Sequence, residues 1–331
     1  MHTSELDYEL PEALIAQKPA EPRDSSRLMV VDVREGRISH HVFRDLPRFL
    51  QSGDALVLNE TKVLPARLLA RKGSGEVELL FLKDLGGRWE VLARPSKRLK
   101  AGLALTAGGD ELEVVEDLGD GHWVVEGRDV RGTMERHGRM PLPPYIRPTE
   151  DAERSYQTVY ARNPGSAAAP TAGFHFSEEV LDEAGRAGAE IALVTLHVGT
   201  GTFAPIRTEK LEEHRMHAEY YSVPEATVRA VKNADRVVAA GTTVARTLET
   251  WAAGGEKEGE SRLFIYPGYE WRAVDALLTN FHLPRSTLLA MVMGFGGTEL
   301  VREAYRVAVE ERYRFYSFGD AMFLIGGGRN L

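Results

Sequence analysis

The segment from residue 62 to residue 140 has a hydrophobic pattern unlike that of the rest of the chain, and this contrast most constrains the fold. Gly-rich turns separate four short β-rich runs: Glu76 to Leu82, Trp89 to Ala93, Leu112 to Val115 and His122 to Glu126. Several short strands at such spacing are typical of a small barrel or sandwich. The stiff stretch 141–144 then closes the segment. We therefore predict an inserted small all-β, barrel-like domain over residues 62–149.

The remaining residues, 1–61 and 150–331, predict a discontinuous α/β main domain. Ser177 is placed to cap a helix that Gly188 ends, and the apolar run Ile191 to Leu196 follows as a buried strand. A second unit predicts a strand over Val237 to Ala240, with a helix that begins after Gly241 and runs to about residue 253. The first amides of such a helix point at an anionic or polar ligand.

The C-terminal part predicts further elements of the same kind. Leu263 to Tyr266 has the composition of a strand, and 274–278 and 287–293 that of helical segments. The last predicted helix is amphipathic, covers Thr298 to Arg312 and has Thr298 as its cap.

The composition excludes several classes of protein. Among 331 residues there is no cysteine, which excludes disulfides, thiolate nucleophiles and Cys-ligated metal sites. The apolar stretches, such as Leu288 to Met293, are too short to span a bilayer, so we expect no membrane role. Since the N-terminus has no basic start followed by an apolar run, we expect a cytoplasmic protein.

Two clusters of glycine, hydroxyl and histidine residues indicate a catalytic pocket. The first covers residues 169–176 and the second 196–203. Glycines let backbone amides approach a ligand, while Thr hydroxyls and His rings exchange protons with it. The residues that we expect to contact a ligand in these clusters are Thr171, Gly173, His175, His197, Gly199, Thr200, Gly201 and Thr202.

The stretch 214–219 contains His214, His217 and Glu219. Alternation from Met216 to Val223 favours a strand, which places His217 and Glu219 on one face as acid–base partners. A metal site at these residues is the alternative.

Other polar and aromatic residues indicate the walls of the same cleft. Tyr266 lies among aromatics around a Pro-Gly turn, where a base or a sulfonium cation can stack. Asp275, Asn280, His282 and Arg285 interrupt an apolar run, so they should line a cleft. Thr242 and Thr243, at the start of the second predicted helix, complete the expected ligand contacts.

The net charge of −8 disfavours a nucleic-acid partner for the chain as a whole, but the charge is uneven. Residues 62–149 carry 15 Lys+Arg against 13 Asp+Glu. Within them Arg94, Lys97, Arg98 and Lys100 form a dense basic group, which we expect to contact RNA.

Long motifs along nearly the whole chain resemble one family. They are Leu14-Ile15-Ala16-Gln17, Asn59-Glu60-Thr61-Lys62-Val63, Pro65-Ala66-Arg67-Leu68, residues 140–146, Tyr156-Gln157-Thr158-Val159-Tyr160, both clusters, Gly241-Thr242-Thr243, Tyr266-Pro267-Gly268-Tyr269, residues 277–284 and Tyr313-Arg314-Phe315-Tyr316. In these the chain resembles the S-adenosylmethionine:tRNA ribosyltransferase-isomerases of queuosine biosynthesis. It departs from them at Phe174, Lys62 and Val244, where the family usually has Leu, Arg and Ser.

The resemblance implies a monomer that moves and isomerises the ribosyl group of S-adenosylmethionine onto 7-aminomethyl-7-deazaguanine at the tRNA wobble position. The products would be epoxyqueuosine-tRNA, adenine and methionine, with S-adenosylmethionine consumed as co-substrate, and with no permanent cofactor and no metal. As proton-transfer groups we favour His217 with Glu219, and as groups that act on the ribose His175 or His197. Two alternatives are a His/carboxylate metallohydrolase and a non-enzymatic RNA-binding module built on the β-domain.

Overall fold

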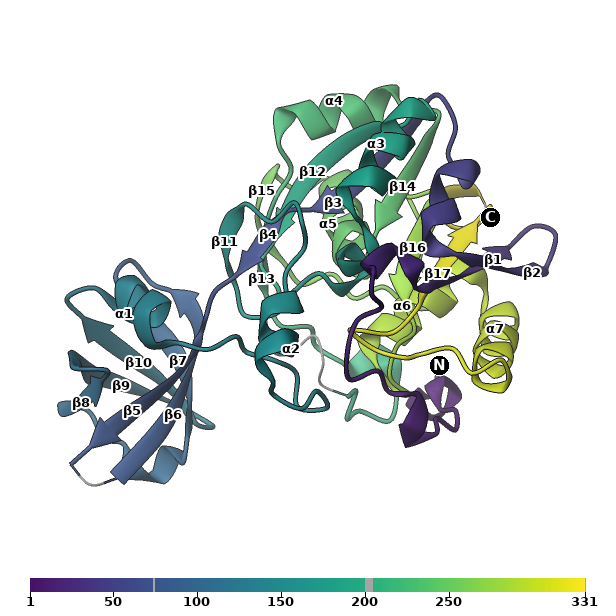
Figure 1. Cartoon of the computed structure of the whole chain (residues 1–331). Coiled ribbons are helices and arrows are strands. Elements are labelled where there is room, and N and C mark those ends of the chain that lie inside the picture. The colour runs from purple at the N-terminus through teal and green to yellow at the C-terminus, as the bar shows by residue number, and fades with distance from the viewer. Residues whose placement is uncertain (74, 200–204, 331) are drawn as a thin grey trace.

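A nine-stranded mixed sheet forms the centre of the larger part of the molecule (Figure 1). The computed structural model describes residues 1–73, 75–199 and 205–330. The strands are β1 (Arg27–Asp32), β2 (Arg37–Val42), β3 (Asp54–Asn59), β12 (Glu190–Leu196), β13 (Glu219–Ser222), β14 (Arg236–Ala240), β15 (Glu258–Ser261), β16 (Ala276–Asn280) and β17 (Ala321–Ile325). Their order is β15-β13-β12-β3-β14-β16-β17-β1-β2.

The central strands β12, β3, β14 and β16 are parallel, so their carboxyl ends meet at one edge of the sheet. Helices cover both faces. One apolar core joins the sheet to α4 (Glu225–Asn233), α5 (Thr242–Ala252), α6 (Thr287–Gly296) and α7 (Thr298–Glu310), and a second joins it to α3 (Glu178–Arg186) and the 3-10 helix Phe43–Phe49. Burial on both faces explains why these strands are continuously apolar.

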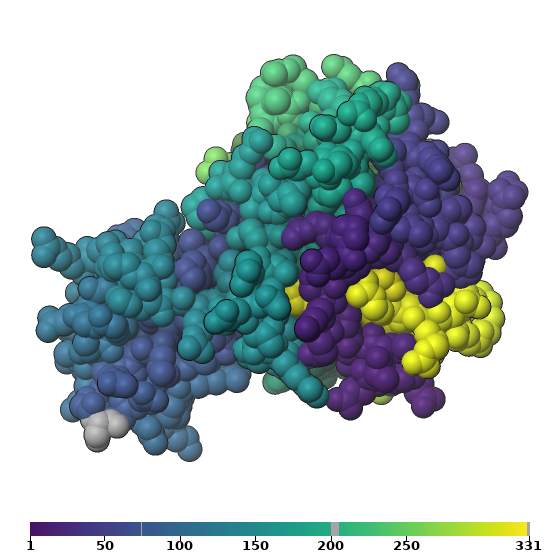
Figure 2. Space-filling view, in the orientation of Figure 1, coloured from purple at the N-terminus to yellow at the C-terminus, as the bar shows by residue number. Residues whose placement is uncertain are grey.

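The smaller part is a closed antiparallel barrel of six strands with its own apolar core. Its strands are β5 (Arg67–Lys72), β6 (Gly75–Asp84), β7 (Arg88–Arg94), β8 (Leu103–Ala107), β9 (Asp110–Gly119) and β10 (His122–Gly127), and α1 (Val130–His137) follows them. The barrel projects to one side of the larger part (Figures 1 and 2). The chain connects the two through β4 (Thr61–Val63), which pairs with β11 (Asn163–Ser166), and through α2 (Glu150–Ser155).

The predicted fold class is confirmed: an α/β main domain carries an inserted all-β barrel. The four predicted β-runs lie in β6, β7, β9 and β10, and Ser177 caps α3 as expected. The domain limits at residues 61/62 and 149/150 stay a prediction.

Three local predictions were wrong. Residues 274–278, predicted helical, lead into and form most of β16, and 263–266 form no strand. β16 is buried along its whole length, and periodicity does not separate a short, fully buried strand from a helix. Thr298 is the first residue of α7, and Gly297 is its cap. Within the described ranges no helix is long and apolar enough to cross a membrane.

Candidate active site at the carboxyl edge of the sheet

Polar residues gather where the parallel strands end. Asn59 ends β3, His197 follows β12, Gly241 follows β14 and Asn280 ends β16. In open α/β sheets the crevice outside the carboxyl ends of the strands is where ligands bind. The topology therefore brings together residues that lie up to about two hundred positions apart in the sequence.

Asn59 fixes this edge. Its side-chain oxygen accepts hydrogen bonds from the amides of Thr61 and Leu196, both at 3.1 Å, and its Nδ2 donates to Leu196 O at 3.1 Å and to Thr243 Oγ1 at 3.2 Å. One buried amide thus ties β3, β12 and the start of α5 together. No role was predicted for Asn59, although a lone amide at the end of an apolar run is the signal that would have singled it out.

Adjoining pockets open at this edge, and two of them share the start of α5. The first lies between the loop 169–172, the start of α5 and the end of β16, and Asn280 and His282 line it. The second has mostly apolar walls, which include Met216, Phe264 and Met291. Thr242, Thr243 and Leu288 line both pockets.

A buried ion pair lies beside the second pocket. Arg246 donates to the Glu219 carboxylate, which also accepts from Gly199 N at 2.7 Å. Nη2 of Arg246 donates to Ser261 O at 2.7 Å and to His217 O at 3.1 Å. Burial lowers the pKa of Arg246, while the charge of Glu219 acts in the opposite direction.

The predicted pairing of His217 with Glu219 on one strand face is wrong in its structural premise. The strand β13 begins only at Glu219, His217 lies outside it with an exposed side chain, and Glu219 is buried against Arg246. The alternation of apolar and polar residues predicted a strand that starts at Met216, but Met216 and Ala218 precede β13. The proton-transfer role of these two residues stays a prediction.

His175 and His282 are both buried and hydrogen-bonded. Ser26 Oγ lies 2.7 Å from His175 Nδ1, and Asn280 Nδ2 lies 3.3 Å from His175 Nε2. His282 Nε2 lies 2.7 Å from Thr279 Oγ1. Burial lowers the pKa of His175 to about 4 and that of His282 to about 3, so both are neutral at pH 7. Both rings therefore serve as hydrogen-bond partners of their neighbours, and His175 contacts Asn280.

His197 differs from them because it is only half-buried. Its Nδ1 lies 2.8 Å from Thr61 Oγ1 and its ring stacks on Tyr220 with centroids 5.3 Å apart. A Cβ at Gly165 would lie 2.5 Å from His197 Nε2, so only a glycine allows the backbone to pack this closely against the ring. Burial lowers the pKa of His197, and the positive charge of Arg131, on α1 of the barrel, lowers it further.

Of the other residues predicted to contact a ligand, some line a pocket and others pack against protein neighbours. Thr171 lines the first pocket, and Gly173 is buried against Tyr160 and Thr158. Tyr266 packs against Phe264, and its backbone approaches Gly294 of α6. Thr200, Gly201 and Thr202 lie outside the described residues.

The polar series from Asp275 to Arg285 is split between the two edges of the sheet. Asn280 and His282 lie at the carboxyl edge and line the first pocket, which agrees with the prediction that they line a cleft. Asp275 precedes β16 at the opposite edge, where its carboxylate accepts from Arg329 and from Val237 N at 2.8 Å. Arg285 forms an exposed ion pair with Asp7. The prediction that all four line one cleft was therefore wrong for Asp275 and Arg285.

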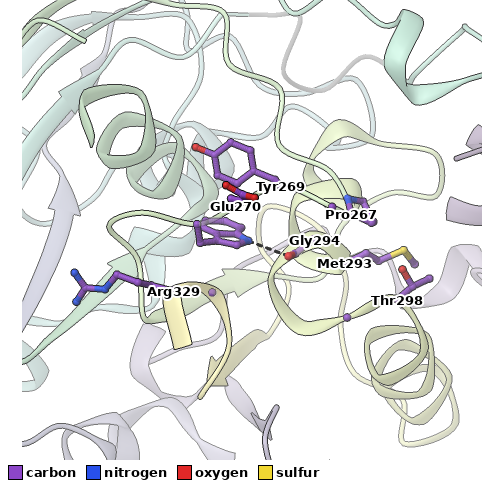
Figure 3. Close-up of a pocket in the computed structure, with 11 residues that line it drawn as sticks. Pro267, Tyr269, Glu270, Met293, Gly294, Thr298 and Arg329 are labelled. Carbon is purple, nitrogen blue, oxygen red and sulfur yellow. Dashed lines mark hydrogen bonds between the residues drawn. The ribbon is translucent and has the colours of Figure 1, made fainter. Parts of the chain in front are cut away.

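A further pocket lies away from this edge, between the turn 267–271 and the ends of α6 and the chain (Figure 3). Pro267, Tyr269, Glu270, Met293, Gly294 and Thr298 are among the residues that line it, and the indole of Trp271 donates to Gly294 O at 2.9 Å. In the part of the chain that the structure describes, no three His, Asp or Glu side chains are grouped to hold a metal ion.

The predicted RNA-contacting residues are exposed on the barrel. Arg94 ends β7, Lys97 and Arg98 lie in the 3-10 helix Ser96–Arg98, and Lys100 follows. Lys72 of β5 reaches the same place, since its Nζ donates to Arg98 O at 3.1 Å. Lys72 therefore adds its charge to the basic group that Lys97, Arg98 and Lys100 form.

These features define a two-part α/β protein with an inserted β-barrel and a polar pocket at the carboxyl edge of its sheet. The family model described as "Queuosine biosynthesis protein" matches residues 3–324, so the chain belongs to this family. A protein of Rubrobacter xylanophilus called S-adenosylmethionine:tRNA ribosyltransferase-isomerase is 74% identical over 100% of both chains. One of the same name from Anaeromyxobacter sp. is 52% identical over 98% of this chain and 99% of its own.

A solved structure agrees with the fold. The crystal structure of S-adenosylmethionine tRNA ribosyltransferase from Thermotoga maritima covers 97% of this chain with 100% of its own, at 41% identity and a TM-score of 0.57. The resemblance inferred from the motifs is thereby confirmed.

Proposed function

We propose that this protein is an S-adenosylmethionine:tRNA ribosyltransferase-isomerase. It transfers and isomerises the ribosyl moiety of S-adenosylmethionine onto 7-aminomethyl-7-deazaguanine at the tRNA wobble position, giving epoxyqueuosine-tRNA, adenine and methionine. The observation that carries the proposal is the 74% identity, over the full length of both chains, to a relative that bears this name.

The reaction consumes S-adenosylmethionine and needs no permanently bound cofactor. The sulfonium acidifies the adjacent C5′ hydrogens, so a base removes one, adenine leaves, the tRNA amine attacks the ribose, and closure of the epoxide expels methionine. The protein must supply a proton acceptor, a proton for adenine and a site that excludes water. The apolar walls beside Leu288 serve the last need.

Among the candidate bases the geometry supports His197 best. A neutral imidazole accepts a proton, and a lowered pKa keeps His197 neutral at pH 7. When Thr61 Oγ1 accepts from Nδ1–H, Nε2 carries the lone pair that can accept a proton. His175 is more enclosed, and His217 with Glu219 remains the next candidate.

The tRNA partner lies against the barrel in this proposal, where Arg94, Lys97, Arg98 and Lys100 are exposed. Phosphate contacts by such residues supply most of the affinity for a nucleic acid. A monomeric state and a cytoplasmic location complete the proposal.

The test is incubation with S-adenosylmethionine and precursor-modified tRNA, followed by chromatography of nucleosides and small products. Adenine and methionine should appear together, and only with precursor-bearing tRNA. S-adenosylhomocysteine as the main product would overturn the proposal. Exhaustive chelation should leave turnover intact; loss restored by a divalent ion would favour the metallohydrolase.

A further inference from the structure

Asn280, which lines the first pocket, has a buried side-chain oxygen. Asn280 is 2% exposed, and its Oδ1 has no hydrogen-bond partner among the residues that the structure describes. The orientation of this amide is fixed, because Nδ2 donates to Tyr316 O at 3.0 Å and a carbonyl can only accept. A buried acceptor without a partner costs free energy, so Oδ1 is built to accept from a ligand.

The start of α5 supplies the opposite chemistry in the same pocket. The first amides of a helix have no partner within the helix, and the helix dipole makes this end favourable for a negative charge. Gly241 has a φ of 110°, which leads the chain sharply from β14 into the helix. None of the residues described as lining this pocket is Asp or Glu, so no protein carboxylate competes there.

The acceptor and the donors are adjacent. Ala240 pairs with Leu278, and Gly241 N donates to Leu278 O at 2.8 Å, so the start of α5 lies beside Thr279 and Asn280. Neighbouring strands lie about 4.8 Å apart. One α-amino acid spans such a gap, with its carboxylate at the helix and its ammonium at the amide oxygen.

We infer that this pocket binds the amino-acid head group of S-adenosylmethionine, and later that of the methionine product. The inference rests on the proposed function. The carboxylate is the only anion of S-adenosylmethionine and takes the amides of Thr242 and Thr243, while the ammonium donates to Asn280 Oδ1. The methylene chain that leads to the sulfur passes Leu288, which lines both pockets, toward the walls formed by Met216 and Met291.

The test uses methionine and two truncated analogues on the whole wild-type protein. L-methionine, L-methioninol, which lacks the carboxylate, and 4-(methylthio)butanoate, which lacks the ammonium, are compared by ligand-observed NMR and as inhibitors of adenine release. A hydrogen bond to a charged group contributes about 1.5–3 kcal/mol. Each analogue should therefore bind at least about 10-fold more weakly than L-methionine.

A proline variant removes one amide from the site. Proline is tolerated at the first position of a helix, so Thr242→Pro deletes an N–H while keeping α5. It should weaken L-methionine about 10-fold or more, and Thr242→Ala, which keeps the N–H, should weaken it less. Glu178→Pro, at the first position of α3 on the other side of the sheet, is the matched control and should leave methionine binding unchanged.

The two proposals fail differently. Equal binding of L-methionine and both analogues, with adenine release intact, overturns the head-group site alone. Methionine binding that discriminates as expected, without adenine release from precursor-bearing tRNA, overturns the proposed function. A normal affinity of folded Thr242→Pro for L-methionine would also overturn the head-group site.

Discussion

His197 is held where the barrel approaches the main sheet. Thr61 fixes one ring nitrogen, Tyr220 supports one ring face, and Arg131 of the barrel lies near enough to affect its pKa. The sequence singled out His197 as part of a polar cluster, because its Gly and Thr neighbours are adjacent along the chain. It did not indicate Thr61, which meets His197 only through the pairing of β3 with β12.

Replacing His197 tests its role as proton acceptor. His197→Gln should lower turnover by about 10² to 10⁴, the usual contribution of a general base. The pH profile of the wild type should keep its activity to a lower pH than an unperturbed histidine allows, because a lowered pKa keeps the base deprotonated. Steady-state adenine release measures both. His41→Gln on β2 is the matched control, and near-normal turnover of folded His197→Gln would transfer the role to His217 or His175.

The buried ion pair between Glu219 and Arg246 was not predicted from the sequence. Glu219→Gln leaves a buried guanidinium without its counter-charge, and breaking such a pair costs about 3–5 kcal/mol of unfolding free energy. Urea denaturation followed by circular dichroism measures this. The double variant Glu219→Leu/Arg246→Met should recover part of the loss, whereas the exposed Glu303→Gln should change little. Unchanged stability of Glu219→Gln would show that the pair is not buried in solution.

At the scale of elements, the predictions succeeded where local signals suffice. Ser177 accepts from Val180 N at 3.3 Å as a helix cap, and Gly188, with a φ of 94°, ends the same helix region. They failed where tertiary structure decides. β5 and β8 escaped detection, and β16 was taken as helix, because its neighbours β14 and β17 determine its conformation.

The loop before β16 depends on one buried carboxylate. Glu249 of α5 accepts hydrogen bonds from the amides of Arg272, Ala273 and Val274 at 2.9, 2.9 and 3.1 Å. Burial raises its pKa, and these donors oppose that effect. Glu249→Gln turns one acceptor into a donor facing an amide, so the loop should lose about 1–3 kcal/mol of stability.

Hydrogen exchange measures this change locally. The amides of residues 272–274 should exchange faster in Glu249→Gln, while those of the barrel strands keep their protection. Equal protection of 272–274 in both proteins would mean that the carboxylate does not hold the loop.

For the whole molecule, the sequence predicted the two-part architecture because strand spacing and strand–helix alternation differ between the parts. It could not place the parts against each other. The two parts meet through residues far apart in the chain, as in the exposed ion pair between Lys83 of β6 and Glu260 of β15 at 2.7 Å. The candidate site was likewise predicted as a set of clusters rather than as one edge of a sheet.

Global stability should fall in mild acid because two histidines are buried neutral. The folded pKa values of His175 and His282, about 4 and about 3, lie below the unfolded value of about 6.5. The unfolded chain therefore binds more protons below about pH 6.5, and stability is lost as the pH falls toward the folded values. Each histidine contributes a slope of about 1.4 kcal/mol per pH unit. Urea titrations between pH 6 and 5 measure it, and His175→Asn should remove about one histidine's share; an unchanged slope would contradict the neutral state.

The exposed basic group on the barrel, formed by Arg94, Lys97, Arg98 and Lys100, contrasts with the acidic net charge of the whole chain. Lys97→Glu/Arg98→Glu should weaken tRNA binding and flatten its dependence on salt, since each lost phosphate contact lowers the log–log slope by about 0.7 to 0.9. Arg229→Glu/Lys232→Glu on α4 makes the same change of net charge at exposed positions of the main domain and serves as control. Filter binding across a salt series measures both pairs. Equal slopes for the two double variants would mean that net charge alone sets the salt dependence of tRNA binding. A lower slope for the α4 pair only would mean that tRNA docks on the α/β domain instead of the barrel.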